Sequence, residues 1–459
     1  MLRSINPFTN EILAELELTK AADLDNNLDR AQNGFINWRQ TSFDKRSQML
    51  ITLSSVLKEN KDAYANLISR EMGKVLKESR KEVEKSAMVL EYFAEHGPDY
   101  LKKEKVKAQE GQGVILYEPL GVVLAIMPWN YPFWQFFRFA ATTLMAGNSI
   151  LLKHSSNVPL CAQKIEEVFV AANSPPGVFQ NLLTSSSNMN NVIKDSRVQA
   201  VSLTGGITAG SDVAAHAGSH IKKTVLELGG SDPFVVLDDA DVKKAARSGV
   251  KGRMKNFGQS CDAAKRFIIH ESIADEFLEE FRKEMASLVF GDPLNEDSDY
   301  ASLASKKQKE LLDQQVSQTL DHGAEIFWNG TRAPAGGAFF NPVIITNIKP
   351  GSPAYKDELF GPVAPVFMVK DDKEALLIAN DTEYGLGASI WSQDFNRARS
   401  MADKVEAGII NLNHEVHSMP ELPFGGIKKS GIGREMAGEG IREFTNKKAL
   451  WYETGMPES

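Results

Sequence analysis

The chain has 459 residues, of which 42% are hydrophobic and 24% are charged, and its formal net charge at pH 7 is −8. This length exceeds one ordinary hydrophobic core and predicts two or three domains of about 100–200 residues each. The acidic balance, with no basic run interleaved with aromatic residues, argues against a nucleic-acid partner.

The first stretch, "MLRSINPFTNEILAELEL", predicts a pair of strands around the turn "NPFTNE". It lacks the apolar core of a signal peptide, and no apolar stretch of the chain approaches the roughly 20 residues that span a bilayer. The two cysteines, Cys161 and Cys261, form no CxxC motif, so we predict neither a disulfide framework nor a metal site. We therefore expect a cytoplasmic protein with no membrane partner.

Residues 21–97 carry apolar side chains at helical spacing, and Gly97 is a candidate helix C-cap. From about residue 112, predicted strands such as "GVVLAIMP", "SILLKHS" and "VQAVSLTG" alternate with helices. Several of these strands are apolar on both faces, which is typical of a parallel sheet covered on both sides. A second alternating series runs from "DPFVVLDD" to "AGIINLN", and the tail "KKALWYETG" is a strand that we expect to pair with the sheet of another subunit.

The pattern therefore predicts an α/β fold in three parts. Residues 1–100 and 120–229 form a Rossmann-like dinucleotide-binding domain, and residues 230–432 form a second α/β domain that is catalytic. Residues 101–119 and 433–459 form a small β extension that joins subunits into a homodimer or homotetramer.

A glycine-rich turn, "SLTGGITAG" at residues 202–210, follows a predicted strand and opens a helix. Glycines let the backbone approach a phosphate, and the helix start offers free N–H groups to it. The same pattern is common wherever a strand turns sharply into a helix, so this stretch alone leaves phosphate contact open.

Two further stretches place polar groups at strand ends. In "VLELGG", Glu227 ends an apolar strand, where it is either a salt-bridged structural acid or a general base with a pKa raised by burial. In "IMPWNYPFWQFFR", Asn130 either caps the following helix or donates its amide to an oxyanion. Trp134 and Arg138 follow at helical spacing, so they share nearly one face with Asn130, and a cation there suits a substrate carboxylate.

These stretches, together with "NFGQSCDAAKR" at 256–266, resemble the aldehyde dehydrogenase superfamily. The resemblance runs over nearly the whole chain and includes "ELFGPV" at 358–363, "NDTEYGLGASIW" at 380–391 and "PFGGIKKSGIGRE" at 423–435. It implies that Cys261 is the nucleophile, and a site that lowers the thiol pKa modestly would supply thiolate. Asn130 and the Cys261 N–H would hold the oxyanion, and Glu227 would activate the water that hydrolyses the thioester. Cys161, inside a predicted amphipathic helix, is assigned to packing.

The same resemblance implies a nicotinamide cofactor. Lys153 would reach the adenine ribose, and Glu358 with Phe360 would hold the nicotinamide ribose. Ser156 stands where the family often has a glutamate that repels a 2′-phosphate, so NADP is the preferred cofactor and NAD remains possible. Gly206 replaces a frequent serine of the phosphate turn. The cofactor residues implied are Pro128, Trp129, Lys153, Ser156, Thr204, Gly205, Gly206, Leu228, Glu358 and Phe360.

Within the superfamily, the chain looks most like compact bacterial succinate-semialdehyde dehydrogenases. Arg138 is placed to pair with the far carboxylate of such a substrate, although a salt bridge within the protein is the alternative. Trp134 and Ser418 are the other candidate substrate residues. A broad-specificity aldehyde dehydrogenase, with Trp134, Phe133 and Phe137 lining an apolar tunnel, remains open. So do a cysteine-dependent esterase and a non-catalytic binding protein on the same fold.

Overall fold

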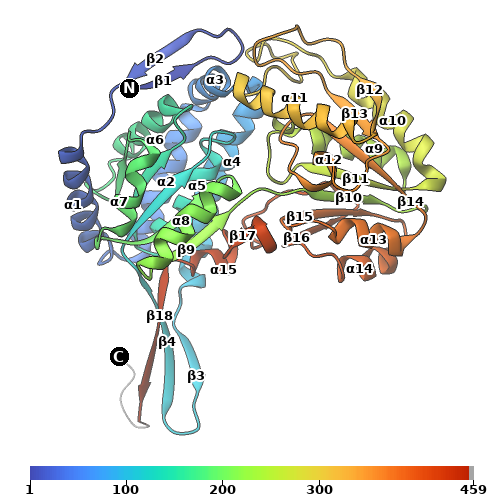
Figure 1. The fold of residues 1–459 in the computed structure, drawn as a ribbon. Helices are drawn as coiled ribbons and strands as arrows, with labels where there is room; N and C mark the ends of the chain where they lie inside the picture. The colour runs from blue at the N-terminus through green and yellow to red at the C-terminus, as the bar shows by residue number, and fades with distance from the viewer. Residues whose placement is uncertain (454–459) are drawn as a thin grey trace.

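The computed structural model describes residues 1–453, which form two α/β lobes and a projecting β arm (Figure 1). The first lobe is built on the sheet β17-β9-β8-β5-β6-β7, and the second on the sheet β12-β13-β14-β11-β10-β15-β16. A hairpin of β1 (Leu2–Ile5) and β2 (Ile12–Leu16) precedes the first lobe, as the sequence predicts. None of the described helices is both long and apolar enough to cross a membrane.

The sheet of the first lobe is parallel except for its short edge strand β17. Its central strand β5 is buried along most of its length, which explains its run of apolar residues. The strands are β5 (Val122–Met127), β6 (Ser149–His154), β7 (Phe179–Asn181), β8 (Val198–Thr204), β9 (Lys223–Glu227) and β17 (Gly431–Ile432).

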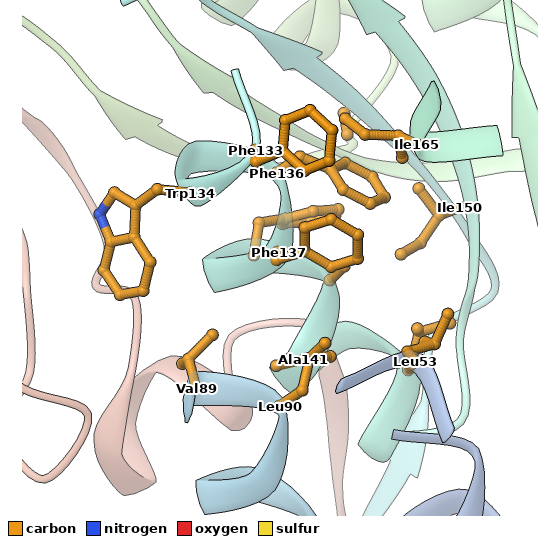
Figure 2. Packing of buried hydrophobic residues seen from close by; sticks show 14 of the residues in the cluster. Leu53, Val89, Leu90, Phe133, Trp134, Phe136, Phe137, Ala141, Ile150 and Ile165 are labelled. Carbon is orange, nitrogen blue, oxygen red and sulfur yellow. The ribbon is translucent and has the colours of Figure 1, made fainter. Parts of the chain in front are cut away.

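Helices cover both faces of this sheet, and one core cluster lies on each face. The helices are α1 (Ala21–Trp38), α2 (Phe43–Glu59), α3 (Lys61–Met72), α4 (Leu76–Tyr100), α5 (Trp134–Met145), α6 (Pro159–Ala171), α7 (Met189–Lys194) and α8 (Ile207–Ser219). Helix α5 is buried along its whole length. Figure 2 shows Phe133, Phe136 and Phe137 facing Ile150 and Ile165, whereas Trp134 points the other way.

The prediction that Gly97 caps a helix is wrong, because α4 continues to Tyr100. A Cβ atom on Gly97 would lie 2.6 Å from Cγ of Met145. The glycine therefore allows α4 to approach the end of α5, and its role is close packing between helices.

The second lobe repeats the α/β pattern, with parallel strands except for the antiparallel edge strand β12. Its strands are β10 (Asp232–Val236), β11 (Ala264–His270), β12 (Glu325–Asn329), β13 (Val343–Thr346), β14 (Val363–Val369), β15 (Gly387–Trp391) and β16 (Ile409–Leu412). Its helices are α9 (Val242–Met254), α10 (Ala274–Ser287), α11 (Lys306–Asp321), α12 (Pro353–Lys356), α13 (Asp372–Asn380) and α14 (Phe395–Ala402).

The β arm contains β3 (Glu104–Lys107), β4 (Gln112–Pro119) and β18 (Thr445–Tyr452), and it projects from the first lobe (Figure 1). Strand β18 pairs antiparallel with β4 of the same chain, from Thr445 opposite Pro119 to Tyr452 opposite Gln112. The tail strand therefore has a partner in its own chain, contrary to the expectation that it needs another subunit. The preceding helix α15 (Ala437–Ile441) contacts α4 and α5 of the first lobe. Residues 454–459 of the predicted extension lie outside the described residues.

Candidate active site

The segment that leads to Cys261 is a left-handed turn. Asn256, Phe257 and Gly258 all have positive φ angles, of 49°, 55° and 76°. The Asn256 N–H donates to both carboxylate oxygens of Glu78 in α4, at 3.1 and 3.2 Å. Positive φ is unfavourable for residues other than glycine, so this contact helps to hold the turn in place. Glu78 thereby fixes the approach of the chain to Cys261.

Cys261 is partly buried and lies on a cavity between the lobes. Burial, together with the neighbouring Asp262 carboxylate, raises its pKa to about 12, while Lys265 and Arg138 oppose that shift. The expectation of a lowered thiol pKa is therefore wrong for this state of the protein. The physical reason is that a desolvated site beside a carboxylate disfavours a second anion. Cys161 is fully buried in the core of the first lobe, in agreement with its assignment to packing.

Asn130 does not cap α5. Its amide Nδ2 donates to the carbonyl oxygen of Gln259 at 3.0 Å, which ties it to the Cys261 segment. The start of α5 is satisfied by Glu82, whose Oε1 accepts from the N–H groups of Phe133 at 2.8 Å and Trp134 at 3.1 Å. An amide has two N–H donors, so Asn130 keeps one that no described residue accepts. That donor is available to an oxyanion.

Glu227 ends β9 as a fully buried carboxyl group. Among residues 1–453, neither of its side-chain oxygens has a hydrogen-bond partner. Burial raises its pKa well above the usual value and the nearby Glu435 adds to the rise, while Arg138 and Arg434 oppose it. A Cβ atom on Gly425 would lie 2.6 Å from its Oε1, so the glycine leaves room for the carboxyl group. Glu227 is therefore not the salt-bridged structural acid that was one of its two interpretations from the sequence.

Arg138 is an almost fully buried residue of α5 that pairs with the buried carboxylate of Glu435. Its guanidinium lies 4.3 Å from the ring centre of Phe424 and 5.8 Å from that of Trp134. The salt-bridge alternative is therefore present in the structure, and the role of Arg138 toward a substrate remains a prediction. The guanidinium also lowers the pKa of both Cys261 and Glu227, so its charge favours the anionic form of each.

The cavity beside Cys261 has a volume of about 490 Å³. Trp134, Arg138 and Ser418 line it, as the sequence predicts. Phe133 and Phe137 do not, because both lie in the core of the first lobe. The apolar tunnel considered from the sequence therefore retains only Trp134 of its three aromatic residues.

The turn at residues 204–206 has the features of a phosphate site. Gly206 precedes α8, which begins without a side-chain cap, and the space that a Cβ atom of Gly206 would enter is open. The Thr204 hydroxyl is buried and has no partner among residues 1–453. Gly205 donates its N–H to the backbone of Glu227, so it holds the turn to β9. An uncapped helix start with an unpaired hydroxyl beside it fits a phosphate group.

The residues that the family resemblance assigns to the two riboses of the cofactor are Lys153, Glu358 and Phe360, with Ser156 beside Lys153. The Lys153 ammonium donates to the Ser186 hydroxyl at 3.3 Å, and Ser156 is exposed. Phe360 meets Trp129 edge to face at 5.7 Å. Glu358 pairs with Lys265 at 3.1 Å and accepts from the Gly230 N–H at 3.1 Å. Pro128 and Trp129 are half-buried at the end of β5, while Leu228 is buried against Gly210 of α8, and its role toward the cofactor remains a prediction.

Sequence reasoning missed several groups at the site. Glu78, Glu82 and Lys85 of α4 line the cavity, and Glu435 neutralises Arg138. Their helical spacing resembles an ordinary solvated face, and only the fold brings α4 against α5 and the Cys261 segment. Within residues 1–453, no cluster of three or more His, Cys, Asp or Glu side chains is placed to hold a metal ion.

The site thus combines a glycine turn suited to phosphate with a cysteine thiol on a cavity. The chain belongs to the aldehyde dehydrogenase family, whose sequence model matches residues 1–450. It is 44% identical to the succinate semialdehyde dehydrogenase [NAD(P)+] Sad of Escherichia coli K12, over 98% of this chain and 97% of that protein. It is 40% identical to the succinate-semialdehyde dehydrogenase [NADP(+)] of Deinococcus radiodurans, over 97% of this chain and 94% of that one.

Solved structures agree with this assignment. The succinic semialdehyde dehydrogenase of Streptococcus pyogenes in complex with NADP+ superposes with a TM-score of 0.96 at 36% identity, over 99% of this chain and all of that chain. The family and the α/β fold class that the sequence predicts are confirmed.

Proposed function

We propose that the protein oxidises succinate semialdehyde to succinate, with NADP as the preferred cofactor and NAD as a possible one. The observation that carries this proposal is the position of Cys261 on a cavity where two of the cationic side chains, Lys81 and Lys85, form no ion pair within residues 1–453, which suits an aldehyde bearing a carboxylate. The names of the relatives support it, since they are succinate-semialdehyde dehydrogenases.

In this proposal the Cys261 sulfur adds to the aldehyde carbon and forms a thiohemiacetal. The second N–H of the Asn130 amide and the N–H of Cys261 stabilise the charge on the former aldehyde oxygen. Because Cys261 is a thiol in the free protein, its proton must pass to solvent water in the cavity as the bond forms, which leaves Glu227 free for the later hydrolysis. Arg138 favours this step, since its charge stabilises the thiolate.

A nicotinamide held by the cofactor residues would supply the hydride acceptor that converts the thiohemiacetal on Cys261 into a thioester. Glu227 then takes a proton from the water that attacks this thioester, and succinate leaves as the thiol is restored. Burial raises the pKa of Glu227, which makes its carboxylate a stronger base than an exposed one.

For the cofactor, we assign the phosphates to the turn at Thr204, Gly205 and Gly206. The adenine ribose with its 2′-phosphate goes to Lys153 and Ser156. Lys153 has no carboxylate partner in the described part of the chain, and together with Ser156 it offers a donor set that suits a phosphate. The nicotinamide ribose goes to Glu358 and Phe360, beside Pro128 and Trp129.

The test is the formation of NADPH from NADP with succinate semialdehyde and, in parallel, with hexanal. We expect kcat/KM to be at least about tenfold higher for the semialdehyde, which corresponds to about 1.4 kcal/mol of additional transition-state stabilisation. Equal or faster oxidation of hexanal would instead support a broad-specificity dehydrogenase.

We also propose the three-part domain division and a cytoplasmic homodimer or homotetramer in which the β arm contacts a second subunit. Strand β18 carries the exposed side chains Leu450 and Trp451, which as consecutive strand residues point to opposite faces of the arm. An arm that projects from the lobes is suited to such a contact (Figure 1). Light scattering on a chain that ends at residue 444 should give a smaller assembly than the full chain gives.

A further inference from the structure

The cationic side chains around the cavity differ in whether they already have a counterion. Arg138 pairs with Glu435, Lys251 with Glu415 at 2.5 Å, and Lys255 with Asp262 at 2.9 Å. Within residues 1–453, Lys81 and Lys85 form no ion pair, and Lys81 is exposed to solvent. Lys85 is therefore the half-buried cation of the cavity that has no carboxylate partner in the described part of the chain.

The ammonium of Lys85 is held in place by two neutral groups. Its Nζ donates to the Ser418 hydroxyl at 2.6 Å and lies 4.2 Å from the ring centre of Trp134. An ammonium has three N–H donors, so one bond to Ser418 leaves two for a ligand. The Ser418 hydroxyl, in turn, keeps its own proton to donate. A cation, a hydroxyl and an aromatic face thus converge on the cavity that also contains Cys261.

We propose that the Lys85 ammonium and the Ser418 hydroxyl together bind the carboxylate of the aldehyde substrate. This inference rests on the proposed function, because it assigns the carboxylate of succinate semialdehyde to a specific residue pair. A substrate carboxylate supplies the counterion that Lys85 lacks, whereas at Arg138 it would compete with Glu435 for a charge that is already neutralised. Lys85 is then the residue that separates an ω-carboxylated aldehyde from a neutral one.

The environment of Lys85 adds a pH signature. Burial and the positive charges of Lys255 and Arg138 lower its pKa to about 8, while Asp262 and Cys261 oppose that shift. Other titratable groups on the same cavity are Glu78, Glu82, Lys81, Lys251, Tyr131, His414, Glu415 and His417. Groups that serve both substrates change kcat/KM for the semialdehyde and for hexanal by the same factor as they titrate. The ratio of the two kcat/KM values is therefore insensitive to those groups. Above pH 8 this ratio should fall by up to about tenfold per pH unit, as the Lys85 ammonium loses its proton.

The experiment compares Lys85→Met (K85M), Lys85→Arg (K85R) and Lys81→Met (K81M) with the unmodified protein, using NADP and both aldehydes. K85M keeps an apolar stem against Trp134 but removes the charge. We expect KM for the semialdehyde to rise about 10- to 100-fold in K85M, the range for one charged hydrogen bond, with a much smaller change for hexanal. K85R should keep the preference and lose its decline above pH 8, because arginine stays protonated. K81M is the matched control, one helical turn earlier on α4, and should keep the wild-type preference.

The outcomes separate the two proposals. If the unmodified protein does not prefer the semialdehyde, the proposed function fails and the Lys85 assignment fails with it. If the unmodified protein prefers the semialdehyde and K85M does so equally, the function stands and the Lys85 assignment is overturned. If K85M does not fold, the comparison of the unmodified protein with K85R tests the assignment instead. An identical fall above pH 8 in the ratio of the two kcat/KM values, in both proteins, would overturn the assignment.

Discussion

Replacement of Glu82 by Gln (E82Q) should destabilise the first lobe, because it breaks a buried ion pair. The side chains of Lys74 and Glu82 are fully buried and pair with each other, and the Lys74 ammonium lies 3.6 Å from the ring centre of Tyr131. Gln keeps an oxygen for the N–H groups at the start of α5 but removes the charge that Lys74 requires. An uncompensated buried charge costs about 3–5 kcal/mol. Because Glu78 also favours the charged form of Lys74 and remains in E82Q, we expect a loss of up to that size in the free energy of unfolding at pH 7.

The loss should shrink as pH rises. Burial already lowers the pKa of Lys74 in the intact protein, and removal of its counterion lowers it further. The unfolded lysine then holds its proton at pH values where the folded one has lost it, so stability rises with pH. The relevant pH range lies between the pKa of Lys74 in folded E82Q and its higher pKa in the intact folded protein. In that range, the difference in unfolding free energy between the intact protein and E82Q should decrease by about 1.4 kcal/mol per pH unit.

Urea unfolding at pH 7 and pH 9, followed by circular dichroism, measures both effects. Glu84→Gln is the matched control, because Glu84 lies on the same helix but pairs with Lys61 at the surface, where ion pairs contribute little. The double variant K74M/E82Q should recover much of the stability, since no unpaired charge remains. A deficit in E82Q below about 1 kcal/mol, or one that is the same at both pH values, would refute this reasoning.

Three further predictions concern the reacting groups and the cofactor. In the free protein, alkylation of Cys261 by iodoacetamide should accelerate about tenfold per pH unit from pH 7 to pH 9, because its pKa is about 12; a plateau within this range would contradict that pKa. Arg138→Ala should lower kcat/KM for the semialdehyde and for hexanal alike, because it removes a charge that favours the anions of Cys261 and Glu227. An effect confined to KM of the semialdehyde would instead indicate that Arg138 contacts the substrate carboxylate. Ser156→Glu should raise KM for NADP by at least about tenfold with little change for NAD, because the new carboxylate would repel a 2′-phosphate; equal KM changes for the two cofactors would argue against the placement of Ser156.

The alternation of strands and helices was predictable because it depends on local patterns. Strand β5, for example, is buried along most of its length, and its residues are apolar throughout. Local pattern also placed Trp134 and Arg138 on the wall of the cavity. Gly97 was misread because its role depends on Met145 of another helix, and such a contact leaves no mark in the nearby sequence.

The electrostatics of the site could not be predicted because they depend on partners that are distant in the chain. The start of α5 is satisfied by Glu82, so Asn130 is free to contact Gln259 instead. Arg138 meets Glu435 from the far end of the chain, and that pairing changes what its charge can do. The pKa of Cys261 follows from burial in a cavity that exists only after both lobes are assembled.

The most direct test of the account uses Glu227→Gln (E227Q) with NADP and succinate semialdehyde. Without the carboxylate that activates water, the thioester should not be hydrolysed, so NADPH formation should stop after the first hydride transfer at each site. We predict a burst of one NADPH per site, and mass spectrometry should find one succinyl group on the peptide that carries Cys261. Steady turnover without a burst, or an adduct on a peptide without Cys261, would contradict the assignment of Cys261 as the nucleophile and Glu227 as the base.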